Sequence, residues 1–154
     1  MEKKKVAIVV GSKSDIGIAE KAETVLREFA IDFSTQVISA HRTPNKIRKF
    51  ASEIDKNGIA VIIAIAGLSA HLPGVLASLT TIPVIGVPVG CGPFKGQDAL
   101  FSIVQMPFGI PTASVGVDNA GNAALFAVEI LSVGDSSLRD KMKTYRKQFG
   151  DEEN

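Results

Sequence analysis

Apolar residues recur along the chain in short runs that are separated by longer amphipathic segments. Five runs have little or no polar alternation, which is typical of strands buried on both faces of a parallel sheet. They lie at residues 6–10, 33–38 (partly polar), 59–66, 83–87 and 112–117. The pattern therefore predicts five strands with helices on both sides of the sheet.

Segments with a helical period lie between these runs. In the first, the apolar residues 18, 22, 25, 26 and 29 form a stripe on one face, and Ser14 or Asp15 stands where an N-cap belongs. Pro44 suits the first turn of a second helix, which Gly58 would stop at about residue 57. Further helices are expected at about residues 71–79, 97–104 and 119–131. Alternating strands and helices predict an α/β fold, a three-layer α/β/α sandwich of flavodoxin or Rossmann type.

A last amphipathic segment follows at residues 136–149. Leu138, Met142, Tyr145 and Phe149 share one face, and the other face is rich in lysine and arginine. This stripe could cover the chain's own core or pack on a neighbouring subunit, and the sequence favours neither. No linker or repeat interrupts the chain. We expect a single domain over residues 1–154, with a core at about 6–131 and an extra C-terminal helix at about 136–149.

Composition and charge narrow the classes of function. The formal net charge is +1 and no basic stripe with interleaved aromatic residues occurs, which argues against a nucleic-acid partner. The first apolar run is too short for a signal-peptide core or a membrane span, so we expect a cytoplasmic protein without membrane contact. The single cysteine cannot form an intramolecular disulfide, and no spacing of cysteine and histidine resembles a zinc site. No metal is therefore expected.

Chemistry is expected in the loops after the strands, since ligands of open parallel sheets bind beyond the carboxyl ends of the strands. Residues 11–15 (Gly-Ser-Lys-Ser-Asp) follow the first strand and open a helix. Backbone N–H groups at a helix N-terminus favour an anion such as phosphate, and Asp15 suits sugar hydroxyls. The loop lacks the phosphate-binding fingerprints for nucleoside triphosphates and for dinucleotides. Taken alone, it is explained equally well as a capped turn.

Two further loops carry the only two histidines of the chain. Residues 39–44 (Ser-Ala-His-Arg-Thr-Pro) place His41 beside Arg42, whose planar fork suits a phosphate. His71 lies among small residues after the next predicted strand. A lone loop histidine is more often structural, but two after consecutive strands indicate a proton-transfer site. We therefore predict an enzyme built around His41 and His71, with Cys91 in a fourth loop as an incidental thiol.

These motifs resemble, in order and spacing, those of the N5-carboxyaminoimidazole ribonucleotide mutases, the class I PurE family of purine biosynthesis. The resemblance rests on residues 11–15, 39–44, 70–74 and 102–107 and spans about residues 6–131. It implies an isomerase that moves a carboxylate from the exocyclic nitrogen of its ribonucleotide to ring carbon C4 in IMP synthesis, with no cofactor or metal. It also implies a flavodoxin-like sheet and a homo-octamer.

The resemblance also implies roles for individual residues. His41 would be the main acid/base residue, with His71 lining a CO2 pocket beside it. Arg42, with Ser14 and Ser39 nearby, would hold the 5′-phosphate, and Asp15 would bind the ribose hydroxyls. The remaining substrate-binding residues would be Ser12, Gly67, Ser69, Ala70 and Leu72, with Ser12 and the backbone of residues 67–70 on the imidazole and its carboxylate.

The chain departs from the family's motif in the third loop, and two alternatives to the mutase remain open. Many members of the family have Gly-Gly-Ala-Ala-His where this chain has Gly-Leu-Ser-Ala-His at residues 67–71, so Leu68 and Ser69 change the substrate side of the pocket. A related branch carboxylates aminoimidazole ribonucleotide directly with CO2, but it resembles Ser-Ala-His-Lys and lacks the histidine of the third loop. Arg42 and His71 therefore favour the mutase. The other alternative is a non-catalytic phosphate- or nucleotide-binding module, since this fold serves many binding proteins.

Overall fold

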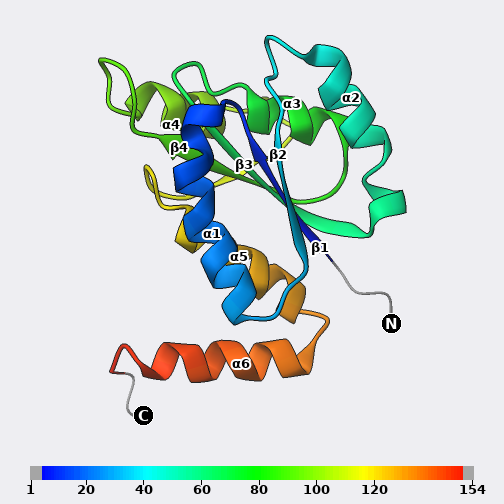
Figure 1. The fold of residues 1–154 in the computed structure, drawn as a ribbon, viewed down its shortest axis with the longest axis vertical. Helices are drawn as coiled ribbons and strands as arrows, with labels where there is room; N and C mark the ends of the chain where they lie inside the picture. Colours follow the sequence, from blue (N-terminus) through cyan, green and yellow to red (C-terminus); the bar gives the residue numbers. More distant parts are fainter. Residues whose placement is uncertain (1–4, 151–154) are drawn as a thin grey trace.

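The computed structural model describes residues 5–150, which form a five-stranded parallel sheet between two layers of helices (Figure 1). The strands are β1 (Lys5–Val10), β2 (Phe33–Val37), β3 (Ile59–Gly67), β4 (Val84–Val89) and β5 (Ala113–Ser114). Their order in the sheet is β2-β1-β3-β4-β5, and every pairing is parallel. This order is that of the flavodoxin-like fold, and it confirms the predicted sandwich.

Helices cover both faces of the sheet. One layer contains α1 (Ile16–Glu28) and α5 (Ala120–Ser132), and the other contains α2 (Pro44–Ser52), α3 (Leu72–Leu79) and α4 (Gln97–Val104). Neighbouring residues of the central strand β3 point to opposite faces of the sheet. Ile63 packs in the core under α1 and α5, and Ile62 packs in the core under α2, α3 and α4. Burial of apolar side chains on both faces thus holds the sheet between its helices and leaves the loops at the ends of the strands for function.

The C-terminal helix α6 (Ser136–Lys147) lies across the ends of the layer formed by α1 and α5, at the bottom of Figure 1. Leu138 and Met142 are buried in the core of that layer, and the Tyr145 ring lies 5.4 Å from the Phe29 ring between centroids. Phe149, at the end of the stripe, is 70% exposed. The first three members of the stripe therefore pack on the chain itself.

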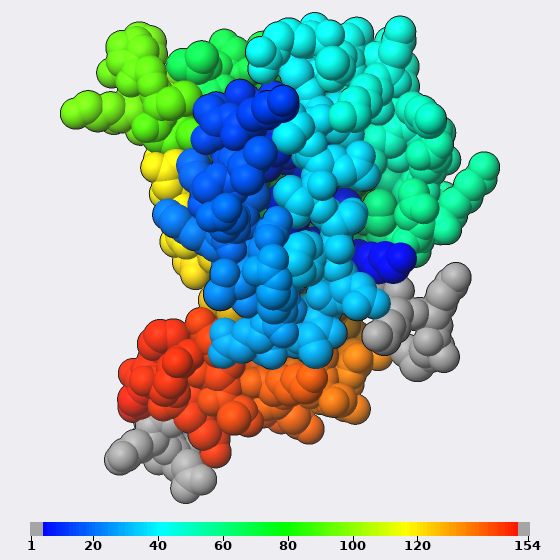
Figure 2. Space-filling view, in the orientation of Figure 1, coloured from blue at the N-terminus to red at the C-terminus, as the bar shows by residue number. Residues whose placement is uncertain are grey.

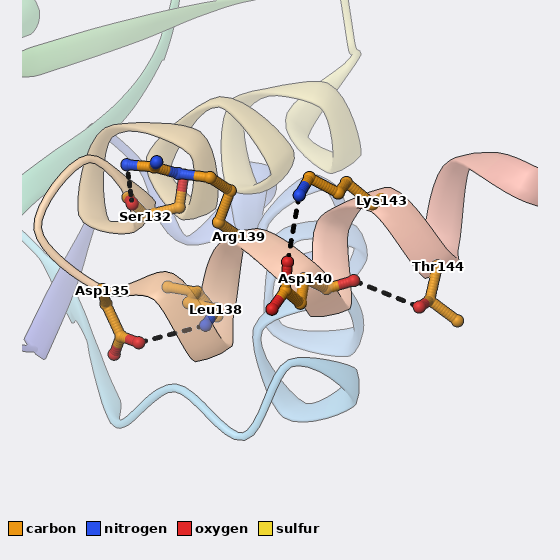
Figure 3. Close-up of polar contacts among 7 residues, drawn as sticks. All are labelled: Ser132, Asp135, Leu138, Arg139, Asp140, Lys143 and Thr144. Atoms are coloured by element: carbon orange, nitrogen blue, oxygen red, sulfur yellow. Dashed lines mark hydrogen bonds and ion pairs between the residues drawn. The ribbon is translucent and has the colours of Figure 1, made fainter.

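Polar contacts fix the turn between α5 and α6 (Figure 3). The Asp135 carboxylate accepts the backbone N–H of Leu138 at 3.0 Å, which caps the start of α6. Arg139 Nη2 donates to the carbonyls of Ser132 and Val133 at 3.1 and 3.0 Å. Carbonyls at the end of a helix lack partners within it, so these contacts stabilise the junction.

Two elements are shorter than predicted. Helix α2 ends at Ser52 rather than at about residue 57, because the chain tightens into a turn that brings Ile54 into the core. A 3₁₀ helix, η2 (Asp55–Asn57), follows and ends at Gly58 with φ of 65°. Strand β5 pairs regularly with β4 only over its two residues instead of over 112–117, and beyond it the chain meets β4 through Val115 N–H to the carbonyl of Gly86 and Asp118 N–H to that of Pro88.

No helix within residues 5–150 is long and apolar enough to cross a membrane.

The packing of α6 predicts how two substitutions on its stripe differ. Met142→Ala should lower the free energy of unfolding by about 2–5 kcal/mol, because it empties a buried site. Phe149→Ala should change it by about 0.5 kcal/mol or less, because that ring is exposed. Denaturant unfolding measures both. An equal loss for Phe149→Ala would contradict this account and place the end of the stripe in a subunit contact.

Candidate active site

The loops after β1, β2 and β3 meet at one edge of the sheet, because the carboxyl ends of parallel strands point the same way. They enclose a cavity of about 630 Å³. Its lining consists of Gly11, Ser12, Ser14 and Asp15 after β1; Ser39, Ala40, His41 and Arg42 after β2; Ala66, Gly67, Leu68, Ser69, His71 and Leu72 from the end of β3 to the start of α3; and Cys91 after β4. A larger hollow of about 1010 Å³ at the other end of β4 is lined by one charged residue, Asp55, and no histidine.

The two histidines are in direct contact inside this cavity. His41 Nε2 lies 2.7 Å from His71 Nδ1, and the rings meet edge to face at 75°. One of these nitrogens must donate and the other accept, so the two rings cannot both be fully protonated while the contact lasts. Such a pair can give a proton to a ligand and take one back.

Local structure sets the position of each histidine. His71 directly precedes α3, whose first turn contains Pro73 and whose side chains Leu72 and Leu76 are buried. Proline at this position favours the start of a helix, and the buried leucines fix its orientation. His41 lies in the loop between β2 and α2, which the hydrogen bonds of Ser39 and Thr43 hold closed.

The same loop orients Arg42 for an anion. The Ser39 hydroxyl accepts the backbone N–H of Arg42 at 3.1 Å and its Nε–H at 3.3 Å. Arg42 Nη2 also reaches the carbonyl of Gly11, in the loop after β1, at 3.5 Å. A guanidinium carries five N–H donors, so these contacts leave donors for a phosphate.

Hydroxyl and carboxylate groups form a chain in the loop after β1. The Ser14 hydroxyl lies 2.9 Å from both Ser12 Oγ and Asp15 Oδ1. Ser12, not Ser14 or Asp15, supplies the capping oxygen here, for the short helix η1 (Lys13–Asp15) that precedes α1. Asp15 occupies the N-cap position of α1 without a capping hydrogen bond, and it is 7% exposed. Its carboxylate therefore has accepting capacity for donors such as sugar hydroxyls.

Every predicted site residue except Ala70 lines the cavity. Ala70 is 1% exposed, its methyl group packs in the core under α2, α3 and α4, and its N–H donates to the carbonyl of Leu68. The cavity does include Cys91, which we interpreted from the sequence as incidental. Leu68 also lines it, with a left-handed φ of 54°, a conformation that glycine would adopt without strain.

Within residues 5–150, histidine, cysteine, aspartate and glutamate side chains form no cluster of three or more that could hold a metal ion.

Comparisons with known proteins confirm the resemblance. The AIR carboxylase family model matches residues 5–152. An N5-carboxyaminoimidazole ribonucleotide mutase from Pyrococcus abyssi is 53% identical, covering 94% of this chain and 83% of the relative. A phosphoribosylaminoimidazole carboxylase from Saccharomyces cerevisiae is 47% identical over 94% of this chain, but only 25% of that relative is covered. The crystal structure of Treponema denticola PurE is similar with a TM-score of 0.86 at 33% identity, covering 94% of this chain and 90% of that one. This chain belongs to the AIR carboxylase family.

Proposed function

We propose that this chain is an isomerase that converts N5-carboxyaminoimidazole ribonucleotide to 4-carboxy-5-aminoimidazole ribonucleotide in purine biosynthesis. The observation that carries the proposal is the contact of 2.7 Å between His41 and His71 in a cavity that also holds Arg42. The Pyrococcus abyssi relative that is 53% identical bears the name of this activity.

The cavity offers a group for each part of this substrate. Arg42, oriented by Ser39, would bind the 5′-phosphate through charge-assisted hydrogen bonds. The chain of Ser14 and Asp15 would accept and donate hydrogen bonds to the ribose. Ser12 and the backbone of residues 67–69 would then face the imidazole and its carboxylate.

The histidine pair matches the proton balance of the reaction. The N–C bond of the carbamate breaks to release CO2, and the exocyclic nitrogen takes a proton. Ring carbon C4 then attacks CO2, forms the new C–C bond and must lose its own proton. The pair would donate the first proton and accept the second, so it ends as it began and the two steps balance without a cofactor.

Part of the cavity wall is apolar and would limit the access of water to bound substrate. Ala40, Ala66, Leu68 and Cys91 supply apolar or weakly polar surface beside the histidines. Water is a competing partner for a reactive carbamate, so a site that excludes it favours transfer over hydrolysis.

A direct carboxylase is the second candidate, because the Saccharomyces cerevisiae relative named for that reaction is 47% identical. Such an enzyme would take CO2 from solution rather than from its substrate. Arg42 and His71 favour the mutase, and the contact between His71 and His41 supports a role for His71 in proton transfer. A non-catalytic nucleotide-binding module would leave the histidine pair without a use.

We also propose a cytoplasmic homo-oligomer, an octamer by resemblance to the family, formed by one catalytic domain per chain. Phe94, Phe101, Val104 and Phe108 are exposed on or beside α4. The yellow-green segment around α4 projects at the upper left of Figure 2. Exposed apolar patches of this kind mark protein–protein contacts. The free thiol of Cys91 suits the reducing cytoplasm.

His41→Asn tests the catalytic role. Turnover of the carbamate substrate should fall by about 10²–10⁴-fold, because the acid/base group is lost. Binding of aminoimidazole ribonucleotide, measured by calorimetry, should be largely kept. Unchanged turnover would show that His41 has another role, and a wild-type protein that binds the nucleotide without any turnover would support the binding module.

Arg42→Lys tests phosphate recognition. Its binding of ribose 5-phosphate should weaken by about 10- to 100-fold, since a charge-assisted hydrogen bond contributes about 1.5–3 kcal/mol and lysine cannot reproduce the planar fork. Arg48→Lys, on an exposed face of α2, is the matched control and should bind as the wild type does. Equal losses for a ligand without phosphate would contradict the assignment of Arg42.

A further inference from the structure

The loop at residues 90–96 forms one wall of the cavity through Cys91. This loop touches the end of β3 and the residue after it at two points. A side chain added at Gly67 would place its Cβ 2.4 Å from Cys91 Sγ, and one added at Gly92 would come within 2.6 Å of Leu68 Cδ2. The cavity therefore keeps its shape only while the 90–96 loop stays against β3.

Asp118, between β5 and α5, holds the start of this loop. Its Oδ1 accepts the backbone N–H of Gly90 at 2.8 Å, and its own N–H donates to the carbonyl of Pro88 at 2.9 Å. A Cβ at Gly90 would lie 2.7 Å from Asp118 Oδ2, so the fit leaves room only for glycine. One residue thus contacts the chain just before Cys91 through both its backbone and its side chain.

The backbone of Asp118 is itself held in an unusual conformation. Its φ is 57°, in the left-handed region that aspartate and asparagine tolerate better than most residues do. Lys21 Nζ of α1 donates to the Asp118 carbonyl at 3.3 Å, which ties the same residue to a second element. Asp118 does not line the cavity. Its side chain therefore acts on the cavity indirectly, and the 90–96 loop is the part of the cavity wall that it contacts.

We propose that Asp118 is a positioning residue whose carboxylate fixes the 90–96 loop and so keeps Cys91 in place as a wall of the substrate cavity. Its consequence for turnover rests on the proposed function: a loosened wall would let CO2 leave before C4 attacks it. The variant enzyme would then release aminoimidazole ribonucleotide and CO2 in place of part of the product. Its effect on the loop does not depend on the substrate.

The single cysteine of the chain reports on this loop directly. Iodoacetamide should alkylate Cys91 about 5- to 10-fold faster in Asp118→Ala, the change expected when one hydrogen bond no longer opposes local opening. Asp118→Gly relaxes the left-handed backbone but also lacks the carboxylate, so it should react as fast as Asp118→Ala. Asp118→Asn keeps an accepting oxygen and should stay near the wild-type rate.

Asp135→Ala is the matched control, because it removes a carboxylate that accepts one backbone N–H at 3.0 Å, far from the loop at the start of α6. It should lower the melting temperature and leave the alkylation rate unchanged. Faster alkylation in Asp135→Ala, or a wild-type rate in Asp118→Gly, would overturn the proposal.

Turnover supplies a separate readout. Asp118→Ala should form less product per carbamate consumed, and Asp118→Asn should restore the ratio. A wild-type ratio in Asp118→Ala, with faster alkylation, would overturn the link between the wall and the reaction. Absence of all turnover in the wild type would overturn the proposed function while leaving the alkylation result intact.

Discussion

Parallel pairing of β1 with both β2 and β3 is the constraint on which the site depends. In this register Val10 lies opposite Val37 on one side and Ile65 on the other, so β1 and β2 end at one level and β3 runs two residues further, to Gly67. The ladder even continues past β1 and β2, through Gly11 N–H to Ile65 and Ile38 N–H to Val10. Three loops far apart in sequence therefore leave the sheet side by side, and His41 meets His71 across 30 residues of chain.

A rigid edge of this kind suits proton transfer better than a loop that moves freely. The central strands are buried on both faces, and the loops they position make short hydrogen bonds among themselves. Donors and acceptors held in place beforehand need no reorganisation when charge develops on a ligand. The contact between His41 and His71 depends most on this fixed arrangement, because a small shift of β2 or β3 would separate the two rings.

Much of the fold and the site could be predicted because it follows from local patterns. Helix α4 has the bounds that its apolar period predicts, and Arg42 lies beside His41 in sequence as it does in space. Contacts between distant residues could not be predicted. The distance between the two histidines depends on strand register, and Ile54 ends α2 early through a core that only the tertiary structure creates. The contact between Asp118 and Gly90 joins two loops that no motif connects, and it lies one residue before Cys91, which lines the cavity.

The source of the transferred carboxylate tests the central claim most directly. The carbamate of the substrate is labelled with ¹³C, and the protein is given this substrate in unlabelled bicarbonate. If His41 and His71 act on CO2 that stays in the cavity where it is released, the label should be retained at the C4 carboxylate of the product. Product carboxylate that has equilibrated with the unlabelled bicarbonate would contradict the mutase and support the direct carboxylase.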